Sequence, residues 1–294
     1  MGSFILFCKS FKNDVLRVKN LCASVAQFNI DKIPFYICIP SSDVDIFINC
    51  INFKALNLLD RGRFYLITDE EIVRVSPKAD LIKYHQTHGY LLQQIIKSEA
   101  WRLLHCDSYF CIDSDSYFIK NFYLSNFFHE DGNPLTLMHD NHEFLQLAKQ
   151  LNKNEVIASF KKNAQLLQTE FNRIGPIWDF GPSPLIWSSN VWRQLAQDHL
   201  SAKGESIWDA LERLPFEILW YGETLLKYQT FPIHQIKPLF YVYHYDWQKN
   251  IHVDLTDYIG IVSQSNWDHH LLPSFAKKSI ISRAWKNLKK NLHL

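Results

Sequence analysis

Residues 109–118 read Tyr-Phe-Cys-Ile-Asp-Ser-Asp-Ser-Tyr-Phe, an apolar run that leads into two aspartates one residue apart. The apolar part has the length and composition of a buried β-strand. It follows a segment, 89–105, whose apolar residues recur at helical spacing. Because open α/β sheets bind their ligands at the carboxyl ends of strands, Asp113 and Asp115 fall where a binding site is expected.

The same alternation of strand and helix extends back to the start of the chain. Apolar runs of strand length are separated there by stripes at helical spacing. The predicted strands and helices are 3–8, 14–28, 35–39, 44–51 and 64–67. We therefore predict an α/β fold with a Rossmann-like, mixed but mostly parallel sheet flanked by helices.

The pattern changes after residue 120, where helices dominate. The expected elements are helices at 144–151, 154–173, 191–199, 205–214 and 216–228, and strands at 185–187, 239–245 and 258–262. A loop rich in Gly and Pro covers 175–184. We expect one domain, 1–272, with two halves, 1–122 and 123–272.

The composition excludes several classes of protein. A formal net charge of +1 leaves no overall basic field, so we expect no nucleic-acid partner. The cysteines form no CxxC pair, and the histidine pairs form no zinc pattern with them. No apolar run approaches the roughly 20 residues that span a bilayer. With no signal sequence at its N-terminus, the chain is expected in the cytoplasm.

Segment 273–294 is expected to form a basic amphipathic helix. It holds six of the 31 basic residues and no acidic one, so the rest of the chain has 25 basic against 30 acidic residues. Its apolar residues Ile281, Trp285, Leu288 and Leu292 share one helical face. The helix either lies on an anionic inner-membrane surface, which makes the protein peripheral there, or docks on the acidic body.

Asp113 and Asp115 are the strongest candidates for chemistry. Two neighbouring carboxylates repel each other unless a cation neutralises them, and Mg²⁺ or Mn²⁺ takes oxygen ligands and bridges to a diphosphate. Such a cation stabilises a departing nucleoside diphosphate. Two alternatives stay open: turn or cap residues, and an aspartyl-phosphate phosphatase or phosphotransferase, which normally carries its aspartates on the first strand.

The segment 90–122 resembles GT-A glycosyltransferases, most closely a poorly characterised bacterial family linked to surface-polysaccharide synthesis. The match consists of 93–98, Gln-Gln-Ile-Ile-Lys-Ser, and of 112–122, which contains the Asp-Ser-Asp motif. Ser98 departs from the apolar residue that the family has there. Less specific matches are 4–8, 39–43 and 216–222.

The resemblance implies a GT-A fold and the transfer of a sugar from a nucleotide-sugar donor to a growing bacterial surface glycan, such as capsule, lipopolysaccharide or exopolysaccharide. The acceptor is lipid-linked in one version of this hypothesis. The implied cofactor is Mn²⁺ or Mg²⁺ on Asp113 and Asp115, with His244 as a further ligand or else a structural histidine. The donor contacts expected from it are Lys9, Ser10, Asp43, Gln94, Lys97, Asp113, Ser114 and Trp178.

Three of these residues also have a structural explanation. Lys97 is equally well explained as a solvated residue on its helix. Asp43 is placed to cap a helix, and we favour that role. Trp178, in the loop 175–184, either packs on a sugar face or fills the core.

An inverting transfer needs a carboxylate that activates the acceptor hydroxyl. Glu217 is the first candidate, and Glu223 and Asp179 follow it. Glu217 is equally suited to a helix start, where the helix dipole favours an acidic side chain. A third alternative for the whole chain is a non-catalytic nucleotide- or carbohydrate-binding protein.

Overall fold

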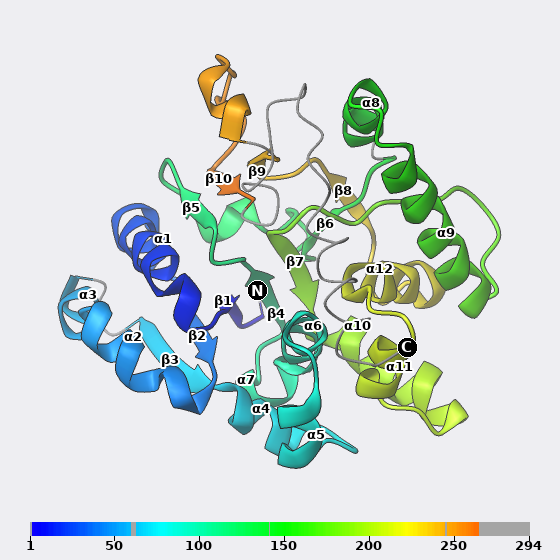
Figure 1. Ribbon diagram of the computed structural model, residues 1–294, viewed down its shortest axis with the longest axis horizontal. Coiled ribbons are helices and arrows are strands. Elements are labelled where there is room, and N and C mark those ends of the chain that lie inside the picture. The colour runs from blue at the N-terminus through cyan, green and yellow to red at the C-terminus, as the bar shows by residue number, and fades with distance from the viewer. Residues whose placement is uncertain (1, 60–62, 141, 245, 265–294) are drawn as a thin grey trace, which may run out of the picture.

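The main sheet of the computed structural model, which describes residues 2–59, 63–140, 142–244 and 246–264, has five strands. Their order is β3-β2-β1-β4-β7 (Figure 1). The strands are β1 (Phe4–Lys9), β2 (Phe35–Ile39), β3 (Phe64–Thr68), β4 (Ser108–Cys111) and β7 (Leu185–Ser188). Only β7 is antiparallel to its neighbour. This confirms the predicted α/β class with a mixed, mostly parallel sheet.

Alternate residues of β1 belong to two different cores. Phe4, Leu6 and Cys8 lie in one buried cluster. Ile5 and Phe7 lie in the other. Because successive side chains of a strand point to opposite faces, both faces of the sheet are covered, which explains why its strands read as continuous apolar runs.

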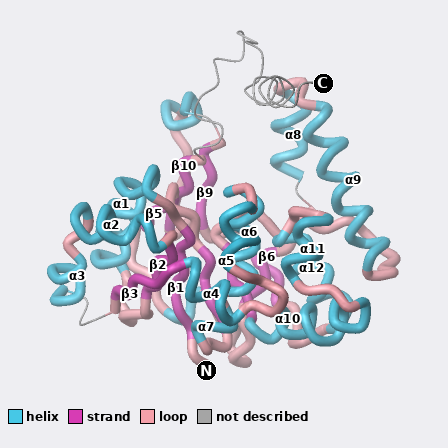
Figure 2. Tube along the Cα trace, turned by 60° about the horizontal axis from the view of Figure 1, so that its bottom comes forward, coloured by secondary structure: helices cyan, strands magenta, loops and turns pink. Residues whose placement is uncertain are grey.

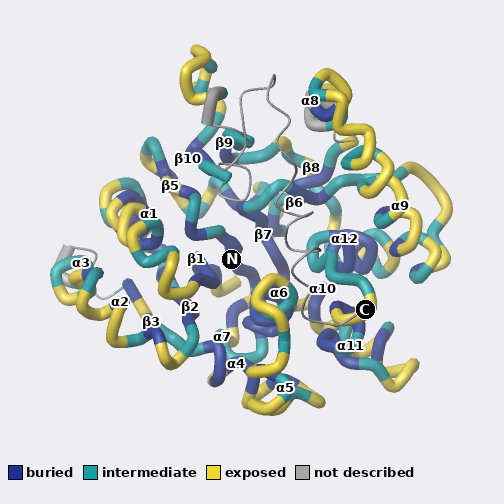
Figure 3. Tube along the Cα trace, in the orientation of Figure 1, coloured by how far each residue is buried: buried dark blue, intermediate teal, exposed yellow. Residues whose placement is uncertain are grey.

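Helices from different parts of the chain cover the two faces. The Phe4 face is covered by α1 (Val15–Phe28) and α2 (Val44–Cys50). The Phe7 face is covered by α4 (Asp69–Val75), α6 (Gly89–Glu99), α10 (Ser189–Gln194), α11 (Ile207–Arg213) and α12 (Glu217–Tyr228). Figure 2 shows helices on both sides of the strands, and Figure 3 shows that the central strands are largely buried.

The remaining helices are α3 (Phe53–Leu59), α5 (Leu81–Gln86), α7 (Trp101–Leu104), α8 (His142–Gln150) and α9 (Asn154–Glu170). The segment 89–105, expected as a single helix, forms the two helices α6 and α7 with Ala100 between them. His105 ends the second one in the left-handed conformation, with φ of 46°.

Two smaller sheets complete the fold. The first has the order β5-β10-β9, with β5 (Ser116–Phe118) antiparallel to β10 (Gly260–Ser263), and β9 (Phe240–Tyr243) parallel to β10. The second pairs β6 (Leu135–Leu137) with β8 (His234–Ile236). The short strands β5, β6 and β8 were not predicted. Since β5 begins directly after Asp115, the aspartate motif joins the main sheet to the first small sheet.

Within the described part of the chain, no helix is both long and apolar enough to cross a membrane. The basic helix predicted at 273–294 lies outside the described residues. All six cysteines carry free thiols, and five of them are buried.

Candidate active site

The aspartate motif lies at the carboxyl edge of the main sheet, beside the end of β1. From β1 the chain builds the sheet first towards β2 and β3 and then, on the other side, towards β4. Such a reversal of strand order opens a crevice at which α/β sheets bind ligands. The register pairs Phe7 with Cys111, so Asp113 comes level with Lys9 at this switch point.

Asp113 is held by two residues of α6. Its Oδ1 atom lies 2.5 Å from Lys97 Nζ and 3.4 Å from Gln93 Nε2. The Lys97 side chain is only 6% exposed, whereas that of Asp113 is 26% exposed. Burial acts to lower the pKa of Lys97, but the Asp113 carboxylate outweighs this and raises that pKa well above its usual value. The site therefore contains an ammonium group that is charged at neutral pH, beside a partly exposed carboxylate.

Glu217, from the second half of the chain, joins the same place. It begins α12, and its backbone N–H donates to Gln94 Oε1 at 3.3 Å. Burial raises the pKa of Glu217, the Lys97 ammonium opposes that rise, and the Asp113 carboxylate adds to it. We call Gln94, Lys97, Asp113 and Glu217 the central cluster. It unites three separate stretches of sequence.

Ser114 ties the aspartate motif to the loop after β1. It is buried, and its hydroxyl donates to Asp14 Oδ2 at 3.1 Å. Asp14 also pairs with Arg17 at 2.7 Å. Sequence analysis had not selected Asp14, because nothing in its local pattern indicates a partner 100 residues further along the chain.

Asp115 and His244 lie at the same end of the first small sheet. The Ser263 N–H donates to the Asp115 carbonyl at 2.9 Å, and the Gln264 N–H donates to the Tyr243 carbonyl at 3.1 Å. His244 Nδ1 lies 2.9 Å from Gln264 Oε1, and burial lowers the pKa of this histidine.

The expected metal ligands Asp113, Asp115 and His244 do not form a closed three-ligand site. In the described ranges, the ligand atoms of three such residues come within 4.8 Å of one another at His129, Asp131 and His234 instead. Mg²⁺ does not require a closed protein site, since one or two carboxylates together with substrate phosphates commonly hold it. The two aspartates therefore still fit a cation that arrives with a diphosphate.

Lys9 and Asp43 make internal contacts. Lys9 Nζ lies 3.0 Å from Asp69 Oδ2, with side-chain exposures of 7% and 0%. Ser10, the next residue, is buried at the end of β1. Asp43 occupies the N-cap position of α2, as expected, but its side chain makes no cap hydrogen bond to that helix. Its carboxylate accepts the Lys12 N–H at 2.8 Å and so fixes the loop after β1.

The loop 175–184 is anchored beside the start of α12. Asp179 exchanges backbone hydrogen bonds of 2.8 and 2.9 Å with His139, and its Oδ1 accepts the Gly181 N–H at 2.9 Å. Burial raises the pKa of Asp179. Trp178 is partly buried against the core. Phe180 packs so closely on Gly222 of α12 that a methyl group there would overlap its ring.

Glu223 is engaged in a buried ion pair. Its two carboxylate oxygens accept from Arg173, Oε2 from Nε at 2.5 Å and Oε1 from the terminal guanidinium at 2.8 Å. Side-chain exposure is 1% for Glu223 and 13% for Arg173. Arg173 also donates to the Pro176 carbonyl at 3.0 Å, so this pair fixes the beginning of the loop.

Sequence analysis also missed the group of His129, Asp131 and His234. The spacing of His129 and Asp131 gave only a weak indication, because the third member lies 103 residues after Asp131. The pairing of β6 with β8 brings it to the other two.

Comparison with known proteins gives no direct functional assignment. No curated protein matches the chain. A solved structure, the mannosyltransferase Ktr4p from S. cerevisiae, is similar over 41% of this chain and 34% of its own, with 12% identity and a TM-score of 0.31. The chain thus spans about a third of that protein, and so small an overlap bears on neither fold nor function. The model of a family described as "Family of unknown function (DUF6492)" matches residues 4–278, so the chain belongs to that family.

Proposed function

We propose that this chain is a metal-dependent glycosyltransferase of the GT-A kind, which moves a sugar from a nucleotide donor to an acceptor hydroxyl. The resemblance of the segment 90–122 suggests a growing bacterial surface glycan, free or lipid-linked, as the acceptor. The single observation that carries the proposal is the central cluster. A carboxylate at the switch point, a buried lysine and a second carboxylate from the other half of the chain meet there.

The aspartates suit a cation that comes with its substrate. Asp113 offers a partly exposed carboxylate at the sheet edge, and Asp115 follows two residues later. A bound Mn²⁺ or Mg²⁺ would supply charge stabilisation for the departing diphosphate. Lys97 supplies a further positive charge at the same place, and its raised pKa keeps it charged at every physiological pH. The hydrogen bond from Ser114 to Asp14 ties the segment between the aspartates to the loop after β1.

Glu217 is the best candidate for the base that activates the acceptor. A catalytic carboxylate works best when its pKa lies near the operating pH, and burial shifts the pKa of Glu217 in that direction. The other two candidates have structural partners. Both oxygens of Glu223 are taken by Arg173, and Asp179 accepts a hydrogen bond within its own loop.

The test is a panel of UDP-, GDP-, CMP- and dTDP-sugars, measured by thermal shift and by slow donor hydrolysis with and without Mn²⁺. We expect one donor class to stabilise the wild-type chain by more than about 1 kcal/mol only when metal is present. Asp113→Asn and Asp115→Asn should lose this effect. Asp45→Asn, a matched change at an exposed position of α2, should keep it.

The outcomes separate the alternatives. Binding of no nucleotide sugar under any metal condition would reject the glycosyltransferase proposal and favour a phosphatase or a binding protein. Binding that survives in Asp115→Asn would support the donor site but contradict the assignment of Asp115 as a metal ligand. Binding with no turnover towards any acceptor or water would favour a non-catalytic protein.

A further inference from the structure

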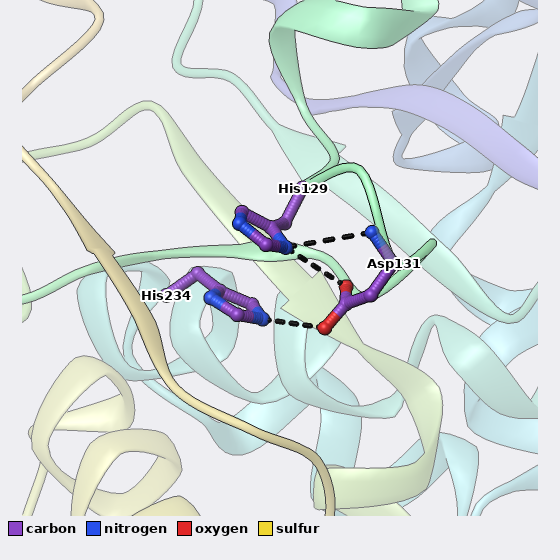
Figure 4. A group of neighbouring side chains, drawn as sticks. All are labelled: His129, Asp131 and His234. Atoms are coloured by element: carbon purple, nitrogen blue, oxygen red, sulfur yellow. Dashed lines mark hydrogen bonds and ion pairs between the residues drawn. The ribbon is translucent and has the colours of Figure 1, made fainter.

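Two histidines and an aspartate from distant parts of the chain meet away from the central cluster. His234 Nε2 lies 2.7 Å from Asp131 Oδ2, and His129 Nδ1 lies 3.2 Å from Asp131 Oδ1 (Figure 4). The two imidazole rings stack with centroids 3.5 Å apart and planes 10° apart. Both rings therefore direct a nitrogen towards the same carboxylate.

A tight turn presents two of these side chains. The His129 N–H donates to the Asn133 carbonyl, and the Gly132 N–H returns to the His129 carbonyl, each at 2.9 Å. Gly132 has a φ of 84°, a conformation that glycine adopts without strain. Asp131 Oδ1 accepts the Asn133 N–H at 2.9 Å, which orients the carboxylate. His234 opens β8, where it pairs with Leu135 just beyond the turn.

This group lies near the opposite edge of the main sheet from the aspartate motif. Phe128, the residue before His129, packs against Phe4 at the start of β1, with ring centroids 5.2 Å apart. Lys9 and the switch point lie at the other end of that six-residue strand, about 17 Å further along at roughly 3.3 Å per residue. A ligand on the histidine group would therefore not touch a donor diphosphate at Asp113.

The donor set points to a different class of metal from the one proposed at the aspartates. Imidazole nitrogens suit Zn²⁺, Ni²⁺ and Co²⁺, whereas Mg²⁺ and Mn²⁺ prefer oxygen ligands. One ligand atom from each of the three residues lies within 4.8 Å of the other two. The two carboxylate oxygens of Asp131 lie 2.7 Å from His234 Nε2 and 3.2 Å from His129 Nδ1. A tetrahedral Zn²⁺ with ligands at about 2.0–2.2 Å sets adjacent ligand atoms about 3.3–3.6 Å apart, so small side-chain rotations suffice.

We propose that His129, Asp131 and His234 form a binding site for one divalent transition-metal ion of the Zn²⁺ class, with water in the remaining position. Asp131 is exposed and both histidines are partly exposed, so solvent reaches the site. The metal would link the turn of residues 129–133 to β8 and so join two segments that interact in the described structure through the short pair β6–β8. This site is independent of the proposed transfer reaction.

The test uses the full chain without an affinity tag, freed of metal by chelation. Zn²⁺ affinity is measured by competition with a chromogenic chelator, and Co²⁺ loading is followed by its visible absorption, which is intense for tetrahedral coordination. Since the loss of a mere second-shell partner costs 10–100-fold in metal affinity, His234→Gln and Asp131→Asn should weaken Zn²⁺ binding by at least about a hundredfold. Circular dichroism checks that both variants fold.

Two control variants locate the metal. His252→Gln removes an exposed histidine elsewhere, and Asp115→Asn removes the motif carboxylate. Both should still bind one Zn²⁺ per chain with wild-type affinity and give the tetrahedral Co²⁺ spectrum. The proposal is overturned if the wild type shows no saturable Zn²⁺ binding, or if His234→Gln binds as tightly as the wild type. In either case the group is a hydrogen-bonded cluster only.

Discussion

Lys97 Nζ lies 2.5 Å from Asp113 Oδ1, and the lysine is the buried member of the pair. Lys97 comes from the last turn of α6, and Asp113 from the loop after β4. The ammonium group therefore approaches from inside the protein and leaves the carboxylate partly exposed at the edge of the sheet. Such a pair both fixes the rotamer of Asp113 and adds a positive charge beside the place where we propose that a diphosphate binds.

Replacing Lys97 by Met should weaken metal-dependent donor binding by at least about tenfold, because a hydrogen bond to a charged group contributes about 1.5–3 kcal/mol. Isothermal titration with the donor in Mn²⁺ measures the effect. Lys19→Met, at an exposed position of α1, is the matched control and should bind like the wild type. Unchanged affinity in Lys97→Met would mean that the lysine only neutralises Asp113.

The Lys97 pair should not make stability depend on pH between pH 5 and 9. Its pKa is raised in the folded state, so its contribution is fully present below the unfolded pKa of 10.5 and is lost only as pH rises through the folded value. Because Lys97 also holds down the pKa of Glu217, the comparison is made in a Glu217→Gln background, where urea unfolding with and without Lys97→Met should differ by a constant amount over that range. A difference that changes steeply near neutral pH would contradict the assignment.

Glu217→Gln should abolish most turnover and yet stabilise the protein at neutral pH. Burial raises the pKa of Glu217, so the folded state holds its proton more tightly than the unfolded chain. Its stabilising effect is present below the unfolded value of 4.5 and is lost as pH rises through the folded pKa. The variant should gain about 0.5–2 kcal/mol in free energy of unfolding at pH 7.5 and almost nothing at pH 4.

The same substitution tests the role of Glu217 as a base. General-base catalysis contributes about 10²–10⁴-fold, and kcat should fall by that factor in Glu217→Gln. In the wild type, kcat/KM should rise with pH on a limb whose midpoint lies above 4.5, since only the ionised carboxylate accepts a proton. A stabilised variant with full turnover would show that Glu217 is merely a partly buried helix-start residue.

Local sequence patterns were sufficient to predict the main sheet and the position of the aspartate motif at its edge. The strands of the first half are continuous apolar runs because both faces of the sheet are covered, and that pattern is visible without any long-range information. The same holds for the motif at the end of β4. The partners of the site residues were not predictable, because each ion pair joins distant segments.

Lys9 and Glu223 illustrate this limit. In the sequence each is a charged residue near the predicted site. In the structure Lys9 pairs with Asp69, 60 residues away, and Glu223 pairs with Arg173, 50 residues away. Three strands of the two small sheets were not predictable for a related reason. β5, β6 and β8 have three residues each, too few to show an alternation of period two. These strands pair through tertiary contacts, and the same pairing brings the histidine group together.

Gly222→Ala should destabilise the protein by about 1–3 kcal/mol, the usual cost of overpacking a filled core. An added methyl group would overlap the ring of Phe180, which would have to move with the loop that carries Asp179. Thermal unfolding measures the loss. Gly89→Ala is the control, since a methyl group at that helix start meets nothing within 4 Å.

A second substitution shows whether the contact itself is responsible. Phe180→Leu replaces the ring with a smaller side chain and so makes room for the added methyl group. The double variant Phe180→Leu/Gly222→Ala should therefore recover part of the stability that Gly222→Ala loses. Turnover should recover along with it if the loop has returned to its place beside Glu217. Additive losses in the double variant would mean that Gly222 is required for another reason.

Removing the carboxylate of Glu223 alone should strongly destabilise the protein. Glu223→Gln leaves the Arg173 guanidinium partly buried without its carboxylate, and breaking a buried pair in this way costs about 3–5 kcal/mol. Urea unfolding should show this loss, and much of the variant should be recovered as aggregate rather than as folded protein. Low activity in Glu223→Gln would therefore not distinguish a structural role from a catalytic one.

The double variant Arg173→Met/Glu223→Leu makes that distinction. Replacing both members of a buried ion pair with apolar residues of similar volume is often neutral for stability, because neither charge is then left without its partner. If Glu223 acts only through Arg173, the double variant should fold, bind donor and turn over within about threefold of the wild type, a difference below 1 kcal/mol. A well-folded double variant with no turnover would instead make Glu223 the base, and Glu217→Gln would then have to retain activity.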